Sequence, residues 1–113
     1  MTDREQVAQD RALLELAAKA AGYSINTSPG KPIWLASSGV EVKLWNPLTD
    51  DGDALRLAVR LKMDVSQDYN GDNCVGIDHW KLGLLLESNN DDPYAATRRA
   101  IVRAAAEIGK DMK

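Results

Sequence analysis

The sequence predicts an α+β domain in which three helices pack on a small, mainly antiparallel sheet of four or five strands, in the order α-β-β-α-β-β(-β)-α. Apolar residues recur at helical spacing in three tracts, around residues 3–21, 50–62 and 91–111. Short alternating apolar runs, separated by Gly, Asn and Ser, fill the stretches between them. The 113 residues, 44% of them hydrophobic and 27% charged, suit a single domain over residues 1–113 with one core.

The first helix is expected to run from about Asp3 to Ala21. Thr2 and Glu5 have the spacing of a capping box, in which each side chain bonds to the other's free backbone donor at a helix start. The apolar stripe starts only after the second turn, so residues 1–10 are expected to project or fray. Ser24 to Lys31, which includes a proline and a glycine, has the composition of a surface loop.

A β-hairpin is expected next. Ile33–Ala36 and Val40–Trp45 are apolar or alternating runs, and Ser37-Ser38-Gly39 between them has the composition of a hairpin turn. Asn46-Pro47 then ends the second strand, because proline cannot donate a hydrogen bond to a sheet and disfavours helix at the residue before it.

The second helix is expected from about Asp50 to Lys62, with Thr49 or Asp50 as its cap. Asp51 and Asp53 add negative charge to the first turn, where it meets the positive end of the helix dipole. The aspartates could alternatively hold a hard cation. Ligands of such a cation usually converge from a loop that wraps the ion, whereas these lie on a helix start, so no metal is expected.

Apolar residues cover more than half of the circumference of this helix, so the helix must contact two neighbours. One neighbour is expected to be the sheet. The other is a neighbouring helix or a second copy of the protein, because exposed Leu55 and Val59 would leave an apolar ridge in water. Leu55 and Val59 are therefore the candidate residues for self-association as a homodimer.

Further strands and a third helix complete the expected fold. Met63 to Tyr69 alternates as a strand, Asn70-Gly71 signals a tight turn, and Cys74–Ile77 and Lys81–Glu87 form one bent strand or two separate strands. Asp91 or Asp92 followed by Pro93 is a strong helix start, and the helix is expected to end near Asp111. Its core stripe consists of Tyr94, Ile101, Ala105, Ile108 and Met112.

A row of basic residues lies opposite that stripe, namely Arg98, Arg99, Arg103 and Lys110. Such a face could contact nucleic-acid phosphates or an acidic protein, although it is more often only solvated. Glu107 and Asp111 dilute its charge, and no aromatic residue is interleaved to stack on bases. The net charge of −3 adds no overall attraction to nucleic acid, so nucleic-acid binding is not favoured.

Trp80 is the candidate anchor for a partner, because its neighbours Asp78, His79 and Lys81 are polar and exposed tryptophans often dominate protein interfaces. His79 belongs to the same candidate surface. An enzyme in which Asp78 polarises His79 is an alternative, but the sequence offers no obvious nucleophile and no phosphate-binding loop. We therefore expect no catalytic residue and no cofactor.

The composition also bears on location. No apolar run approaches the length that a bilayer crossing needs, and the chain starts with charged residues where a secretory signal would be apolar. A soluble, intracellular protein without membrane contact is expected. The single cysteine, Cys74, cannot form an internal disulfide and is expected to be a partly buried core residue.

Two blocks carry a resemblance to a known group. Residues 45–61 (WNPLTDDGDALRLAVRL) and residues 91–110 (DDPYAATRRAIVRAAAEIGK) resemble segments of small uncharacterised proteins of tailed bacteriophages and prophages. The resemblance implies an αβα-sandwich domain and a place in the host cell cytoplasm. It implies no established activity. It suggests a non-enzymatic accessory protein that binds a host or phage macromolecule, most simply a protein.

Overall fold

The computed structural model describes residues 3–28, 30–38 and 40–112, with residues 3 and 4 as backbone only. The described elements are the helices α1 (Asp3–Ala21), α2 (Asp51–Arg60) and α3 (Pro93–Lys110), the short 3₁₀ turn η1 (Tyr69–Gly71), and the strands β1 (Ile25–Asn26), β2 (Trp34–Ser37), β3 (Val40–Leu44), β4 (Asp64–Ser66), β5 (Cys74–His79) and β6 (Gly83–Ser88). The α+β class is therefore confirmed.

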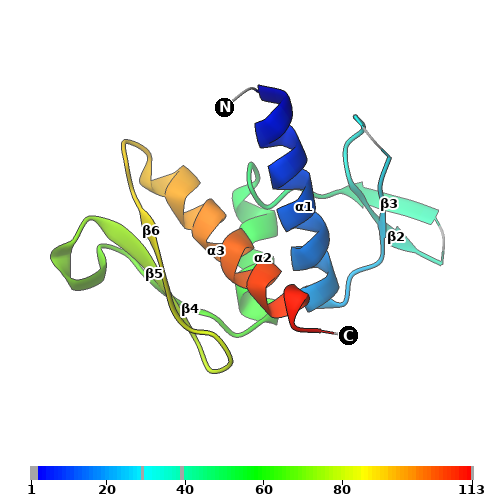
Figure 1. Cartoon of the computed structure of the whole chain (residues 1–113). Coiled ribbons are helices and arrows are strands. Elements are labelled where there is room, and N and C mark those ends of the chain that lie inside the picture. Colours follow the sequence, from blue (N-terminus) through cyan, green and yellow to red (C-terminus); the bar gives the residue numbers. More distant parts are fainter. Residues whose placement is uncertain (1–2, 29, 39, 113) are drawn as a thin grey trace.

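The strands form two antiparallel three-stranded sheets, β1-β2-β3 and β4-β5-β6, instead of the expected single sheet. Figure 1 shows the helices as a central layer, with the first sheet on one side and the second on the other. The layer order is therefore sheet, helices, sheet, whereas the phage resemblance implied a sheet between helices. The hairpins cannot join into one sheet because the directly packed helices lie between them.

Small residues let α1 and α3 pack closely. The buried side chains at this contact are mostly alanine, with Ala17 and Ala18 on α1 and Ala100 and Ala104 on α3. Gly109 marks the closest approach, since a methyl group there would overlap the backbone carbonyl oxygen of Leu16. The alanines of residues 91–110, one of the two blocks that resemble phage proteins, therefore have a packing role.

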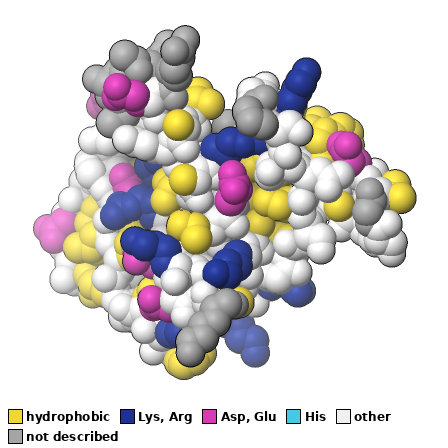
Figure 2. All heavy atoms as spheres, turned by 45° about the vertical axis from the view of Figure 1, so that its right-hand side comes forward, with side chains coloured by type: hydrophobic (Ala, Val, Ile, Leu, Met, Phe, Trp, Pro, Cys, Tyr) yellow, Lys and Arg dark blue, Asp and Glu magenta, His cyan; other side chains and the backbone are white. Residues whose placement is uncertain are grey.

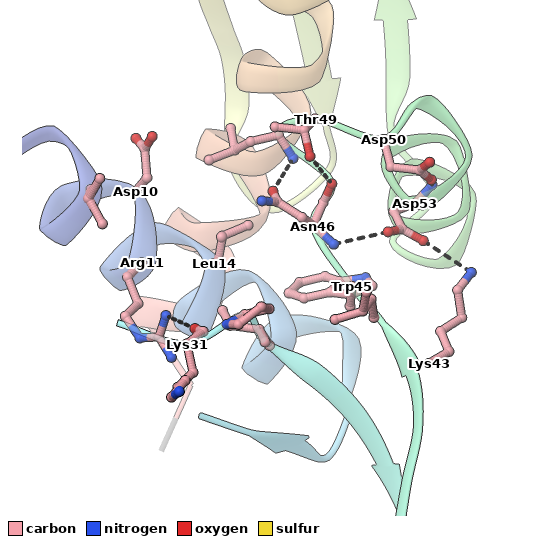
Figure 3. A pocket seen from close by; sticks show the side chains of 15 residues that line it. Asp10, Arg11, Leu14, Lys31, Lys43, Trp45, Asn46, Thr49, Asp50 and Asp53 are labelled. Carbon is pink, nitrogen blue, oxygen red and sulfur yellow. Dashed lines mark hydrogen bonds and ion pairs between the residues drawn. The ribbon is translucent and has the colours of Figure 1, made fainter. Parts of the chain in front are cut away.

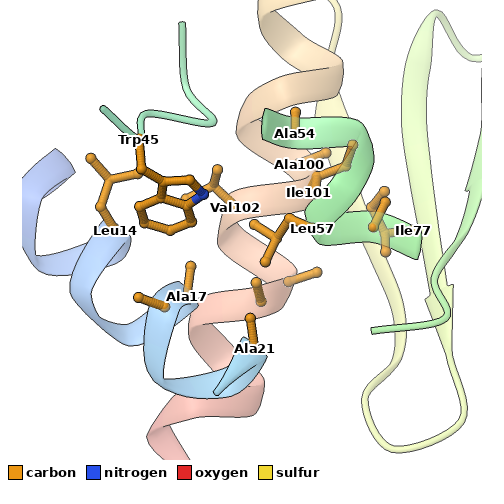
Figure 4. Packing of buried hydrophobic residues seen from close by; sticks show 14 of the residues in the cluster. Leu14, Ala17, Ala21, Trp45, Ala54, Leu57, Ile77, Ala100, Ile101 and Val102 are labelled. Carbon is orange, nitrogen blue, oxygen red and sulfur yellow. The ribbon is translucent and has the colours of Figure 1, made fainter. Parts of the chain in front are cut away.

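The buried face of α2 packs mainly on α3. Leu57 is fully buried in the same cluster as Ile101 of α3 and Ile77 of β5, as Figure 4 shows. The expectation that a sheet would be the main neighbour of α2 is wrong, because α2 contacts α3 more extensively than either sheet. Leu55 and Val59 point away from this core and are 64% and 68% exposed.

Several strand boundaries differ from the prediction. The expected loop 24–31 includes β1, which pairs with β2 through Ile25↔Leu35 and so adds a third strand to the hairpin. The expected strand 63–69 is limited to β4, because Asp68 and Asn70 adopt left-handed conformations that end it. Residues 74–87 form two separate strands joined by a turn.

The helix starts agree well with the sequence. Asp50 caps α2 by accepting a hydrogen bond from the backbone N–H of Asp53, and Asp92 caps α3 ahead of Pro93. Side chains 5–9 of α1 are exposed, and Figure 1 shows the start of this helix extending beyond the neighbouring elements. Thr2 of the expected capping box and Gly39 of the expected hairpin turn lie outside the described residues.

The ends of the expected α3 stripe are not core. Tyr94 is 72% exposed and Met112 is 37% exposed, whereas Ile101, Ala105 and Ile108 are buried. Tyr94 lies in the first turn of α3, at the surface beside α2, and Met112 follows the end of the helix. None of the described helices is long and apolar enough to cross a membrane.

Candidate functional site

The segment from Trp45 to Asp50 forms a tight corner between β3 and α2. The side-chain oxygen of Asn46 accepts a hydrogen bond from the backbone N–H of Leu48 at 3.0 Å. The backbone carbonyl oxygen of Asn46 accepts from the N–H of Asp50 at 2.9 Å. Trp45 and Pro47 are buried below the corner. These contacts account for most of the first phage-like block as a structural element that sets the direction of α2.

Asp53 fixes this corner from inside. Its residue is 4% exposed, and its carboxylate accepts a hydrogen bond from the backbone N–H of Asn46 at 3.0 Å. Its other oxygen lies 3.3 Å from Lys43 Nζ and 2.9 Å from an Arg56 guanidinium nitrogen. Burial alone would raise the pKa of Asp53, but the Asn46 N–H, Arg56 and Lys43 together lower the pKa below its ordinary value. The carboxylate stays ionised and its hydrogen-bonding capacity is largely occupied, so its role is structural.

A cleft of about 520 Å³ lies between α1, β3 and this corner. We call it the α1–β3 cleft. Figure 3 shows Asp10, Arg11 and Leu14 of α1 on one side and Lys43, Asp50 and Asp53 on the other. Its lining consists of Val7, Asp10, Arg11, Leu14, Lys31, Pro32, Ile33, Lys43, Leu44, Trp45, Asn46, Leu48, Thr49, Asp50 and Asp53. The lining therefore combines aliphatic surface with charges of both signs.

Hydrogen bonds hold the loop beside the cleft in place. The Arg11 guanidinium donates to the backbone carbonyl oxygens of Ser28 at 2.7 Å and Lys31 at 2.8 Å. Asp10, on the same turn of α1, accepts from Arg99 of α3 at 3.1 Å. The cleft is thus built on a preformed surface, which reduces the entropic cost of binding.

The first sheet extends the apolar surface outward from the cleft. β3 is an edge strand, and its aliphatic residues Val40, Val42 and Leu44 are 66%, 62% and 53% exposed. Figure 2 shows hydrophobic side chains in the middle of this face and on the part that projects at the right, with charged side chains between them. The alternation of β3 with Glu41 and Lys43 predicted a strand with one apolar face, but alternation alone cannot tell whether anything covers that face.

A second apolar surface lies on α2 and the start of α3. Leu55, Val59 and Tyr94 are each more than 60% exposed, and Leu55 and Tyr94 line a second hollow of about 470 Å³ between the two helices. The sequence analysis identified Leu55 and Val59. Tyr94 was expected in the core, because helical periodicity continues past the point where the supporting elements end.

The basic residues of α3 are each paired with a carboxylate. Arg98 binds Asp51 at 2.7 Å, Arg99 binds Asp10 at 3.1 Å, Arg103 binds Glu87 at 2.5 Å, and Lys110 lies 3.6 Å from Glu107. The expected basic row is therefore largely neutralised within the chain. Little unpaired charge is left there to displace counterions from a nucleic acid.

Trp80 and His79 differ in exposure, although their rings stack with centroids 5.6 Å apart. Trp80 is 84% exposed at the turn between β5 and β6, as a partner anchor would need, whereas His79 is only 6% exposed. His79 Nε2 lies 3.0 Å from the carbonyl oxygen of Leu61, and Nδ1 accepts from the backbone N–H of Lys81 at 3.1 Å. The inclusion of His79 in an exposed binding surface is wrong, because its ring joins α2 to the turn from within.

The geometry does not support a pair in which Asp78 polarises His79. Asp78 is exposed while the flanking Ile77 and His79 are buried, so Asp78 and the His79 ring lie on opposite faces of β5. Both nitrogens of the His79 ring are engaged by backbone groups. Among the residues that the structure describes, no group of three or more His, Cys, Asp or Glu side chains is arranged to hold a metal ion. Cys74 is buried, as expected of a core residue.

Comparison with known proteins gave no match: no family model fits the sequence, and no curated protein or solved structure is significantly similar to it. The resemblance to phage proteins therefore stays a prediction from the two sequence blocks.

Proposed function

We propose that the chain is a non-enzymatic accessory protein of a phage or prophage, and that it binds a host or viral protein in the host cytoplasm through the α1–β3 cleft and the exposed surface of β3. The observation that carries the proposal is the exposure of Val40, Val42 and Leu44 on one edge strand beside a cleft. Contiguous apolar surface of this kind commonly marks a site of protein contact.

The chemistry of the cleft favours a protein partner. Its floor is apolar where Leu14, Ile33 and Trp45 meet, and charged groups of both signs surround it. Protein interfaces combine an apolar centre with a polar rim in the same way. A nucleic-acid site would instead need a predominance of unpaired positive charge, and Lys43 already lies against the Asp53 carboxylate.

The edge position of β3 adds a second way to hold a partner. On the side away from β2 its backbone has no neighbouring strand within the described residues. An extended partner segment could bond to these groups and place a side chain beside Leu44 in the cleft. A β-bulge interrupts the pairing of β2 with β3 and would limit such a segment to a few residues.

The phage origin rests on the two sequence blocks. Their residues mainly form the corner at Asn46, the α2 start and the α1–α3 contact, so the resemblance concerns the scaffold and leaves the partner open. The exposed strand lies outside both blocks.

A capture experiment with matched variants tests the proposal. The tagged protein is exposed to lysate of infected or lysogenic host cells, captured proteins are identified by mass spectrometry, and binding is repeated with the purified candidate. Leu44→Glu should weaken binding at least about tenfold, because it places a charge in the apolar centre of the interface. Leu84→Glu is the control, since Leu84 has similar exposure, 46%, on β6 across the helical layer.

Two results would count against this function. In one, Leu44→Glu and Leu84→Glu bind the purified partner as tightly as the unmodified protein. In the other, capture disappears after nuclease treatment and falls steeply with salt, which would favour the nucleic-acid alternative at Arg98, Arg99, Arg103 and Lys110.

A further inference from the structure

The exposed side of α2 carries an ordered pattern of charge and apolarity. Asp51 lies at its first turn, Leu55 and Val59 follow at successive steps of four, and Lys62 comes just after its C-terminal end. At ~100° per residue Asp51, Leu55 and Val59 fall within about 80° of one another around the axis, and Lys62 follows the end of the helix in a left-handed conformation. We call this row, which reads acid, aliphatic, aliphatic, base, the α2 stripe.

Nothing in the described chain covers the α2 stripe. The opposite face of α2 is occupied, since Ala54, Leu57 and Ala58 are buried against the core. Leu55 and Val59 remain 64% and 68% exposed after this packing. The neighbouring helix α3 covers that opposite face and leaves Leu55 and Val59 exposed, so a cover for these two residues has to come from outside the described chain.

The α2 stripe is complementary to itself. Suppose that a second α2 lies antiparallel across the stripe, with the twofold axis at the level of Leu57 along the helix. Leu55 then faces Val59 of the second copy, and the reverse contact follows by symmetry. Asp51, at the start of one α2, then lies toward the C-terminal end of the second α2, where the exposed Lys62 of that copy follows the helix. The same alignment thus joins two apolar pairs and two opposite-charge pairs.

The surrounding charges permit this contact. Asp51 accepts from Arg98, but its side chain is 76% exposed and can face a second cation. Lys62 is exposed and forms no ion pair with any described residue. Arg56 is held by Asp50 and Asp53, and Arg60 donates to the carbonyl oxygen of Ala21. The arginines of α2 are therefore committed within their own chain, which limits repulsion between two copies.

We infer that a second copy of this chain binds the α2 stripe and forms a symmetric dimer through antiparallel α2 helices. The hollow lined by Leu55 and Tyr94 lies at the edge of this contact and enlarges its apolar area. One short helix and its flank give a small interface, so the dimer is weak and depends on concentration. This inference is independent of the proposed partner site on β3.

The test measures association by sedimentation equilibrium over protein concentrations up to about 1 mM, where a weak dimer is still populated. The unmodified protein should dimerise, and Val59→Glu should be monomeric throughout. Val42→Glu is the matched control, because Val42 is a similarly exposed valine, 62%, on β3. Val42→Glu should dimerise normally even if it loses the proposed partner, which separates the two proposals.

Charge exchange tests the antiparallel register. Asp51→Lys alone and Lys62→Glu alone should each dimerise about tenfold more weakly, because both copies then place like charges together at both ends. A mixture of the two variants should restore dimerisation. In the mixed dimer the introduced lysine of one copy faces the introduced glutamate of the other, and the unchanged Lys62 of the first copy faces the unchanged Asp51 of the second. A monomeric unmodified protein, a dimeric Val59→Glu variant, or a mixture no stronger than its components would each overturn the inference.

Discussion

Replacement of Asp53 tests how the corner between β3 and α2 is held. Asp53→Ala leaves the Asn46 N–H without its acceptor and leaves Lys43 and Arg56 without their shared anion. A buried hydrogen bond to a charged group is worth about 1.5–3 kcal/mol. The side chains of the two cations are 47% and 59% exposed, so each ion pair adds only about 0.2–1 kcal/mol. The expected loss is therefore about 2–5 kcal/mol of unfolding free energy.

Asp53→Asn separates charge from shape. The amide oxygen can still accept from Asn46, so the loss should be smaller, about 1–2 kcal/mol. Urea unfolding followed by tryptophan fluorescence measures both variants, since Trp45 is buried at the same corner. Asp72→Asn, at an exposed aspartate in a turn, is the control and should change stability by less than about 0.5 kcal/mol.

The pH dependence gives the sign of the effect. The pKa of Asp53 is lower in the folded protein than its ordinary value, so folding favours the ionised form. Its contribution is complete above the unfolded pKa, about 3.9, and is lost as pH falls through the folded pKa. The stability difference between the unmodified protein and Asp53→Asn should therefore shrink below about pH 4. This account would be refuted if Asp53→Asn left the unfolding free energy unchanged both at neutral pH and below about pH 4.

Two further substitutions test the packing and the surface. Gly109→Ala should lower the unfolding free energy by about 2 kcal/mol or more, because the added methyl overlaps the rigid carbonyl of Leu16. Gly52→Ala in α2 meets only side-chain ends, those of Arg56 and Asp50, and should be neutral or stabilising by up to about 1 kcal/mol. Equal effects of these two changes in urea unfolding would contradict the close α1–α3 contact. Trp80→Ala should change stability by less than about 0.5 kcal/mol and remove the tryptophan emission most accessible to acrylamide, since Trp80 is 84% exposed and Trp45 only 3%. If acrylamide quenched the tryptophan emission of Trp80→Ala and of the unmodified protein equally, Trp80 would have to be covered, for example by a partner copy.

The sequence could predict those features that depend on neighbouring residues. The starts of α2 and α3 followed from Asp50 and from Asp92-Pro93, because a cap acts within one helical turn. The hairpin of β2 and β3 followed from apolar alternation around a polar turn. The position of Asp53 four residues before Leu57 also placed it on the buried face of α2, a signal that the sequence analysis did not use.

Features that depend on distant residues could not be predicted in the same way. Arg99 is neutralised by Asp10, 89 positions earlier, and no local pattern indicates that pairing. The apolar residues of β3 and Leu55 have ordinary core patterns, yet they are exposed because the helices bury other faces.

The local sequence thus determined where helices and strands begin, end and carry apolar faces, since capping, turn chemistry and periodicity act over a few residues. Only the tertiary structure decided which of those faces are covered. The close packing of α1 on α3 consumes their alanine faces, separates the strands into two sheets, and leaves β3 and the α2 stripe at the surface. Burial is a property of the whole packed chain, and for that reason the candidate contact surfaces emerged only with the fold.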